Sequence, residues 1–306
     1  MLSLIVVVLA ADAGTSQPVL NWSPVSISST PQPLMADGGV KLSAKVTFRG
    51  AVELTSSADT FGGLSGLRFW NGVLYAVSDK RGTLFRFTPT FDAKGTLVGV
   101  SGGEATHLDI GDAEALEFTD DAMLVSNEDS TTLSRFRLLG EQIGSIGERS
   151  PMPTEGWGLG RNKGFEALAV SKDCALAFSE LAGTGFVGPP AALSTAAPNL
   201  TSVAWPTGFS PTDAVWLESG KVAYVALRKF DGLAYAGLAR VTMRECSVQD
   251  FTVEVLAQWG LPLLVDNSEA LTVGLGKEGV ALYLASDDNF RSKGPQRTVL
   301  YKFVVK

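Results

Sequence analysis

The sequence contains a single histidine, His107, among its 306 residues. Zinc, copper and non-haem iron sites are built mainly from imidazole and thiolate groups, so this composition argues against them. A Ser-His-Asp triad would require His107 as its base. His107 lies in the alternating segment 105–110, which is typical of an outer strand, and we interpret it as a surface residue.

Cysteine is almost as rare, with Cys174 and Cys246 in predicted turns of neighbouring structural units. Two cysteines in an exported protein commonly form a disulfide. A bridge tolerates a Cα separation of only about 7 Å, however, and an inner and an outer turn can lie farther apart. The sequence therefore does not decide whether Cys174 and Cys246 form a disulfide or remain free thiols.

The chain has no excess of positive charge and no apolar run long enough to cross a bilayer. Its 25 lysines and arginines are outnumbered by 32 aspartates and glutamates, which gives a net charge of −7. Nucleic acids and anionic membrane surfaces require basic patches, so we expect neither as a partner. A spanning helix needs about 20 apolar residues, and we expect no membrane span.

The apolar segment at residues 2–11 is followed by Ala11-Asp12-Ala13, which is typical of a signal peptide cleavage site. No lysine or arginine precedes the apolar segment, unlike most export signals. We expect an export signal over residues 1–13 and a periplasmic or secreted protein. A buried N-terminal strand is the alternative.

Amphipathic helices are also missing between the predicted strands, which excludes a TIM barrel. Instead, a pair of short apolar runs around a polar turn occurs five times. The first run of each pair begins near a polar anchor, and the anchors are spaced 47 to 56 residues apart: Ser65, Glu114, Glu166, Asp213 and Glu269. A period near 50 residues in strand-like units predicts a β-propeller of four-stranded blades.

The last repeat offers only three strands, whereas the alternating segment 40–54 has no blade of its own. An N-terminal strand that completed the last blade would close the ring and remove an exposed sheet edge. We therefore predict an all-β propeller domain over residues 40–306 with five blades, a degenerate sixth blade being the alternative. Residues 14–39, rich in Pro, Ser and Gly, are predicted to be a linker or loosely attached arm.

Six motifs, in this order along the chain, carry a family resemblance. They are Phe61–Leu67, Ala76–Gly82, Asp112–Leu116, Arg161–Leu168, Asp266–Leu271 and Ser286–Arg291. Together they make the sequence, from about residue 54 onward, similar to the bacterial phytase-like domain family, described as having esterase-like activity of phytase. The resemblance implies a β-propeller that hydrolyses phosphate esters with the assistance of calcium. One departure is alanine at positions 115, 167 and 270, where many such sequences have glycine.

The residues themselves also predict a cation site. In an antiparallel hairpin the first strand begins where the second ends, so the anchors of successive repeats, Asp213 included, should meet at one mouth of the channel. Oxygen ligands without imidazole or thiolate suit a divalent cation, and Ca²⁺ accepts irregular coordination more readily than Mg²⁺. The predicted metal ligands are Asp79, Asp112, Glu114, Asn127, Glu128, Glu166, Glu180, Asn267, Glu269 and Asp287.

Cationic residues interleave with these carboxylates and would bind an anionic substrate group. The predicted substrate-binding residues are Lys80, Arg81, Arg161, Lys163, Arg228 and Arg291. The resulting hypothesis is a monomeric, metal-dependent hydrolase that acts on a small anionic ester. A water activated by the cation would be the nucleophile, and Glu114 or Glu166 would be the general base.

Two other functions stay open. One is a calcium-dependent lactonase or carboxylesterase, and the other is a non-enzymatic propeller that binds a protein or glycan through its loops. A structural ion-pair network would also explain acidic anchors, but so many carboxylates at one mouth would repel one another without a cation. The cationic residues favour a phosphate ester over a neutral lactone.

Overall fold

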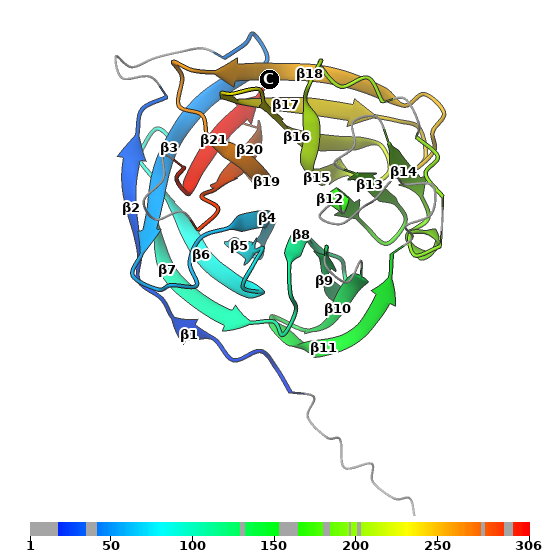
Figure 1. Cartoon of the computed structure of the whole chain (residues 1–306), viewed down its shortest axis with the longest axis horizontal. Helices are drawn as coiled ribbons and strands as arrows, with labels where there is room; N and C mark the ends of the chain where they lie inside the picture. The colour runs from blue at the N-terminus through cyan, green and yellow to red at the C-terminus, as the bar shows by residue number, and fades with distance from the viewer. Residues whose placement is uncertain are drawn as a thin grey trace, which may run out of the picture.

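The computed structural model describes residues 18–34, 42–128, 132–152, 165–179, 184–195, 197–200, 203–276, 279–290 and 296–306. The strands of this part form five sheets that surround a central axis like blades (Figure 1). Its single helical element is the short 3-10 helix η1 (Pro190–Ala192). Nothing in these ranges forms a helix of the length and apolarity that a bilayer crossing requires. The predicted all-β propeller with five blades is confirmed.

Each blade is an antiparallel meander that begins with its innermost strand. Blade one contains β4 (Leu64–Trp70), β5 (Val73–Ser78), β6 (Thr83–Phe91) and β7 (Leu97–His107). Blade two contains β8 (Ala113–Phe118), β9 (Ala122–Asn127), β10 (Thr132–Leu139) and β11 (Gln142–Pro151). The described strands of blade three are β12 (Phe165–Val170), β13 (Ala175–Ser179) and β14 (Gly185–Gly188). Blade four contains β15 (Ser210–Glu218), β16 (Val222–Phe230), β17 (Ala234–Thr242) and β18 (Thr252–Gly260).

Blade five closes the ring. It contains β19 (Asn267–Gly276), β20 (Gly279–Asp287), β21 (Val299–Val305) and, from the other end of the chain, β3 (Val46–Ser56). The pairing of β3 with β21 is antiparallel. All seven residues of β21 are buried, so an unpaired edge there would expose an apolar strand. The predicted closure by an N-terminal strand is confirmed.

Part of the segment predicted to be a linker or loosely attached arm forms strands that pair with the blades. Its strand β2 (Ile27–Gln32) pairs with β3, and its short strand β1 (Ser23–Pro24) pairs with β7. Pro31 is compatible with β2 because this strand is the outer edge of its sheet. Part of the Pro/Ser-rich arm is therefore docked on the propeller. The predicted export signal, residues 1–13, lies outside the described residues.

The core lies between the blades. Five clusters of buried apolar side chains are present, and each contains residues of two neighbouring blades. Between blades four and five, for example, Leu238 and Trp259 pack with Tyr301 and Phe303. His107 is exposed at the end of β7, as interpreted from the sequence. Because sheet faces hold the ring together, the strand ends at the channel mouth are available for polar residues.

A disulfide joins blades three and four. It links Cys174, in the turn between β12 and β13, to Cys246, between β17 and β18. The Cα atoms are 5.6 Å apart, within the range that a bridge tolerates. The turns of the two blades are thus closer than their inner and outer positions suggested.

Every innermost strand carries a bulge near its start, where one extra residue opposes the neighbouring strand. The extra residue is Ser65 in β4, one of Glu114 and Ala115 in β8, Glu166 in β12, Thr212 in β15 and Glu269 in β19. A bulge bends the strand and re-aims a side chain. The sequence anchors coincide with these bulges in four blades. In blade four the bulged residue is Thr212, so Asp213 is not the counterpart of the other anchors.

Candidate functional site

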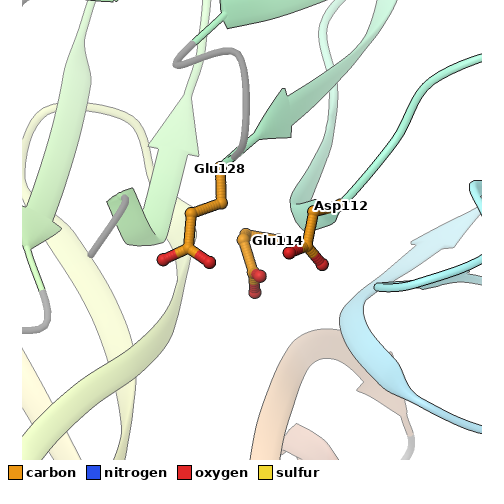
Figure 2. A group of neighbouring side chains, drawn as sticks. All are labelled: Asp112, Glu114 and Glu128. Atoms are coloured by element: carbon orange, nitrogen blue, oxygen red, sulfur yellow. The ribbon is translucent and has the colours of Figure 1, made fainter. Parts of the chain in front are cut away.

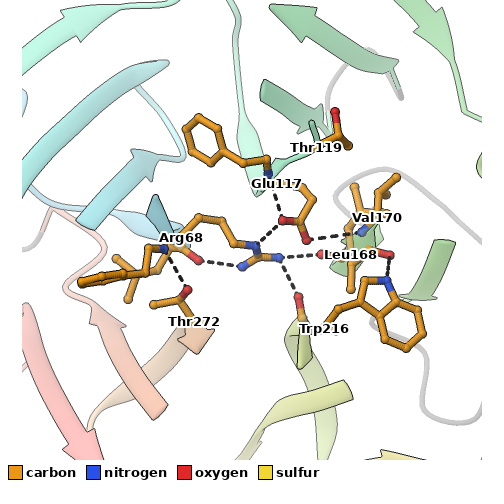
Figure 3. A network of polar contacts seen from close by, with 12 residues as sticks. Arg68, Glu117, Thr119, Leu168, Val170, Trp216 and Thr272 are labelled. Carbon is orange, nitrogen blue, oxygen red and sulfur yellow. Dashed lines mark hydrogen bonds and ion pairs between the residues drawn. The ribbon is translucent and has the colours of Figure 1, made fainter. Parts of the chain in front are cut away.

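The centre of the ring is filled by the side chain of Arg68, which reaches from β4 to the inner strands of the other blades (Figure 3). Its guanidinium donates hydrogen bonds to the carbonyl oxygens of Leu168 at 2.7 Å, Ala214 at 2.6 Å and Leu271 at 2.8 Å. These acceptors belong to β12, β15 and β19. The arginine therefore ties its own blade to blades three, four and five.

Two buried carboxylates neutralise this guanidinium. Asp213 accepts hydrogen bonds from Nη1 and Nη2 at 2.9 and 3.1 Å, and Glu117 of β8 lies 3.2 Å from Nε. Asp213 also accepts the backbone N–H of Leu271 at 2.7 Å. The sequence predicts Asp213 at the acidic mouth, and this prediction is wrong: Asp213 lies one residue beyond the bulge, fully buried against Arg68. The sequence signal for this network was a charged residue, Arg68, inside an otherwise apolar inner strand.

A polar pocket of about 570 Å³ lies at the channel mouth, where the bulges of the inner strands gather. The predicted site residues that line it are Asp79, Glu114, Glu128, Glu166, Arg228, Asn267, Glu269 and Asp287. They come from the starts of inner strands or the ends of second strands, as antiparallel pairing requires. The pocket has an acidic side and an ion-paired side.

A cluster of three carboxylates, which we call the acidic cluster, lies at the acidic side: Asp112, Glu114 and Glu128 (Figure 2). Glu114 and Glu128 line the pocket, and Asp112 adjoins them outside its lining. One carboxylate oxygen from each lies within 4.8 Å of the others, so the three could hold a metal ion. Asp112 precedes β8 and Glu128 follows β9, and a 2.8 Å hydrogen bond from the N–H of Glu128 to the carbonyl of Asp112 joins them. Oxygen-only donors of this kind suit Ca²⁺ or Mg²⁺.

Burial and mutual repulsion disfavour the charged forms of the carboxyl groups on this side of the pocket. Burial raises the pKa of Glu114 well above its ordinary value, and the charges of Glu166, Asp112, Glu128 and Asp79 raise it further. Burial also raises the pKa of Asp287 to about 7, with Asp79 adding to the shift. A divalent cation would therefore compete with protons for these oxygens.

The opposite side of the pocket is occupied by ion pairs. Arg228 pairs with Glu269 and donates a hydrogen bond to Oδ1 of Asn267 at 3.1 Å. Lys229 lies 2.9 Å from Asp231 and 5.4 Å from the ring centre of Tyr235. Glu269 and Asn267, two predicted metal ligands, thus bind an arginine in this structure.

Several predicted residues lie away from the pocket lining. Lys80 is 3.8 Å from Asp79, and Arg81 is 5.6 Å from the ring centre of Phe290, but neither lines the pocket. Asn127 lines a separate hollow with Asp109 and Arg149. The predicted residues Arg161, Lys163, Glu180 and Arg291 lie outside the described residues.

The sequence reasoning missed some lining residues. These are Ser210, Phe230, Asn289 and Gln296, whereas Ser65 is one of the anchors that the sequence predicts at the mouth. The hydroxyl of Ser65 donates a hydrogen bond to the carbonyl of Ala113 at 2.5 Å, which links blades one and two. Both Ser210, which begins β15, and Gln296, in the segment between β20 and β21, lie outside the six motifs.

The conformation of Gly63 accounts for the glycine in the motif Phe61–Leu67. Gly63 has φ 58°, a conformation that favours glycine, and its N–H donates a 2.9 Å hydrogen bond to Asp288. A Cβ atom at Gly63 would lie 2.2 Å from Oδ1 of Asp79. The segment Phe61–Leu67 therefore packs closely against an acidic residue of the pocket.

Several solved structures are similar to this chain at low sequence identity. Among solved structures, the PQQ-bound aldose sugar dehydrogenase from Streptomyces coelicolor is 15% identical with a TM-score of 0.43, over 87% of this chain and 100% of that one. Myxococcus xanthus glutaminyl cyclase is 10% identical with a TM-score of 0.46, over 95% and 99% of the two chains. The periplasmic gluconolactonase of Pseudomonas aeruginosa is 11% identical with a TM-score of 0.40, over 92% and 100%.

A search of curated proteins found no match to this chain. The family described as "Phytase-like: Esterase-like activity of phytase" matches residues 59–290. This range contains the acidic cluster, the Arg68 network and the inner strands of all five blades. Because the match extends over well more than half of the sequence, the chain belongs to the phytase-like family.

Proposed function

We propose that this protein is a cation-dependent hydrolase of phosphate esters that acts in the pocket at the channel mouth. The observation that carries the proposal is the division of one pocket into an acidic cluster and a side that contains Arg228 and Lys229. A cation site beside cationic side chains suits a substrate with a negatively charged ester group. Membership of the phytase-like family supports the same class of reaction.

The acidic cluster has the donor set that a hard divalent cation prefers, with Ca²⁺ the expected ion. When bound, the cation supplies positive charge that offsets carboxylate repulsion and polarises the phosphate oxygens. Arg228 and Lys229 would orient the anionic group from the opposite side of the pocket. Glu166, which neighbours the cluster, would act as the general base, with Glu114 primarily a ligand.

The proposed reaction is a simple displacement. Water attacks the phosphorus atom while Glu166 accepts its proton. The bond between phosphorus and the ester oxygen then breaks, which leaves inorganic phosphate. The departing alkoxide takes a proton from water and leaves as the alcohol, while Glu166 returns its proton to the solvent. The Arg68 network lies in the interior of the ring and takes no part in this step, because its guanidinium is already bonded to carbonyls and carboxylates.

The test combines metal analysis with hydrolysis assays. Purified protein should contain a divalent cation by mass spectrometry, and it should hydrolyse aryl and alkyl phosphates. EDTA should abolish turnover, and Ca²⁺ or Mg²⁺ should restore it. Turnover of lactones or carboxyl esters in place of phosphate esters would support the lactonase alternative. Cation binding without turnover of any ester would support a binding propeller.

Two lysine variants test whether the pocket binds a charged substrate group. The Lys229→Ala variant should lose more kcat/KM on a phosphate ester than on a neutral lactone of similar size, because only the phosphate offers a charge to pair. Lys221→Ala is the matched control, since Lys221 also pairs with a nearby carboxylate, Glu218 at 2.6 Å, but lies outside the pocket lining. Equal losses on both substrates for Lys229→Ala would contradict a phosphate-binding role.

We also propose that the protein is exported to the periplasm or exterior and that residues 1–13 are the export signal. The disulfide between Cys174 and Cys246 supports this, because such bridges persist in oxidising compartments. N-terminal sequencing of protein isolated from the native host should find a mature chain that begins near residue 14. An intact N-terminus on a cytoplasmic protein would contradict export.

A further inference from the structure

Exposed large apolar side chains are few in the described part of the chain, and they are unevenly distributed. Of six such side chains, Phe230, Leu233 and Leu261 line one groove beside the channel mouth. Their exposed fractions are 75%, 48% and 63%. A contiguous exposed apolar surface of this kind marks a binding site more often than a random surface feature.

The groove lies between blades four and five. Its apolar wall comes from the β16–β17 hairpin, which supplies Phe230, Leu233 and Ala234, and from Leu261 and Val265 in the segment between β18 and β19. Its volume is about 440 Å³. Small-molecule pockets typically measure about 300–1,000 Å³. The groove is therefore large enough for an alkyl chain or an aromatic ring.

The groove is continuous with the pocket that contains the acidic cluster. Arg228, Lys229, Phe230, Asn267 and Gln296 line both hollows. A single small molecule can thus place one end beside the acidic cluster and the other end against the apolar wall. Phe230 stands at the junction between the two.

Cationic side chains mark the boundary of the groove. Arg228 and Lys229 line it together with Arg297, whose Nε is 3.6 Å from Asp266. A guanidinium carries five N–H donors, more than one carboxylate accepts, so pairing with Asp266 does not exhaust Arg297. The groove therefore combines an apolar wall with the cationic side chains of Arg228 and Lys229 at the end that it shares with the pocket. This arrangement matches an amphiphile with a negative head.

We propose that this groove, which we call the apolar subsite, binds the alkyl or aryl group of a phosphate ester whose charged group lies in the adjoining pocket. The inference rests on the proposed function and narrows its substrate to amphiphilic phosphate esters. A wholly polar, highly charged phosphate ester would leave Phe230, Leu233 and Leu261 in water. An apolar substituent would cover them and gain affinity from the buried area.

The kinetic test uses methyl, butyl and octyl phosphate with the cation-loaded protein. The kcat/KM of the wild type should rise at least about tenfold from methyl to octyl phosphate, because each buried methylene favours binding severalfold. The double variant Leu233→Ser/Leu261→Ser should lower this octyl-to-methyl ratio by about tenfold. Val248→Ser is the matched control, because Val248 is 43% exposed in the β17–β18 connection, away from the groove. The octyl-to-methyl ratio of this variant should equal that of the wild type.

A binding measurement separates this inference from the proposed function. Isothermal titration calorimetry with methylphosphonate and octylphosphonate needs no turnover, and octylphosphonate should bind the wild type at least about tenfold more tightly. The double variant should lose that preference, and octanol should bind more weakly than octylphosphonate. Hydrolysis that is indifferent to chain length, with equal phosphonate affinities, would overturn the apolar subsite and leave the hydrolase standing. A chain-length preference in binding without any hydrolysis would keep the subsite and reject the hydrolase.

Discussion

At the scale of single residues, the bulges of the inner strands decide which side chains face the channel mouth. Glu114 and Glu166 lie at bulges, and Ser65 at a third bulge ties blade one to the carbonyl of Ala113. A small residue follows the anchor at the bulge in four blades: Gly66, Ala115, Ala167 and Ala270. A Cβ atom at Gly66 would lie 2.7 Å from the backbone nitrogen of Leu116 in the neighbouring inner strand. In blade four this position is Asp213, and its carboxylate binds the arginine that fills the ring centre.

The Glu114→Gln variant should separate the cation role of this residue from its effect on folding. Loss of a carboxylate from the acidic cluster should weaken Ca²⁺ binding by at least roughly 10–100-fold, the cost of losing even an indirect metal contact. Without a cation, the same variant should be no less stable than the wild type, because a neutral amide replaces a carboxyl group whose charged form is disfavoured by burial and by the neighbouring carboxylates. Calorimetric titration with Ca²⁺ and thermal unfolding in EDTA measure the two effects.

The control for this variant is Glu141→Gln, which changes an exposed glutamate in the turn between β10 and β11. It should leave Ca²⁺ affinity unchanged. An unchanged Ca²⁺ affinity in Glu114→Gln itself would remove Glu114 from the site.

The Arg68→Met variant should be strongly destabilised. It would leave Asp213 and Glu117 buried without their cation, and removal of one partner from a buried ion pair typically costs about 3–5 kcal/mol. Urea unfolding followed by circular dichroism measures the loss. Arg244→Met provides the contrast, because Arg244 pairs with Asp250 at 3.2 Å on the exposed surface and its loss should barely change the free energy of unfolding. A comparable loss in both variants would show that the central position of Arg68 is unimportant.

At the scale of elements, the hairpin of each repeat sets the position of the site, and a few long-range contacts hold the hairpins in the ring. Strand β3 joins the two ends of the chain through β21, and the disulfide joins turns of blades three and four. The turn that contains Cys174 lies at the opposite end of its hairpin from Glu166. Changes at the bridge should therefore affect stability without altering the pocket directly.

The Cys174→Ser/Cys246→Ser variant should unfold more easily. The cysteines are 72 residues apart, and closing a loop of this size restricts the unfolded chain enough to contribute about 2–4 kcal/mol. Guanidinium unfolding of the variant and of reduced wild type should show the same loss. Ca²⁺ affinity should stay at the wild-type value, and reductant should have no effect on the serine variant. A change in Ca²⁺ affinity as large as that of Glu114→Gln would show that the bridge supports the pocket after all.

At the scale of the whole molecule, the raised pKa values of the pocket predict that stability depends on pH. Burial raises the pKa of Asp287 to about 7 and that of Glu114 well above its ordinary value. The folded, cation-free protein therefore keeps protons that the unfolded chain has already released. Its free energy of unfolding should rise as the pH falls from about 8 to about 6, and this contribution is lost as the pH rises through the raised pKa values.

A bound cation should reverse this pH dependence. The cation binds the deprotonated carboxylates, so saturating Ca²⁺ should raise the melting temperature more at pH 8 than at pH 6. Scanning calorimetry in EDTA and in Ca²⁺ at the two pH values measures both effects. A melting temperature that EDTA leaves unchanged at pH 8 would argue against any cation in the acidic cluster.

The sequence alone determined the architecture. The period near 50 residues, the alternating apolar runs and the missing fourth strand of the last repeat predicted five blades and closure by an N-terminal strand. These features depend on local patterns, because burial of one sheet face imposes a two-residue period wherever the strand lies. Antiparallel pairing within each hairpin also predicted that Glu114, Glu128 and Glu166 lie at one mouth of the channel, because such pairing depends on the local sequence.

Only the tertiary structure decided how the charged residues divide their roles. A bulge adds a single residue to a strand and is invisible in the repeat spacing, so the sequence did not distinguish Thr212 from Asp213. Arg68 and Asp213 are 145 residues apart, and their pairing depends on how the blades meet at the axis. The apolar subsite likewise combines a hairpin of blade four with the segment before blade five. Contacts between blades depend on the curvature of the whole ring, which no local pattern in the sequence records.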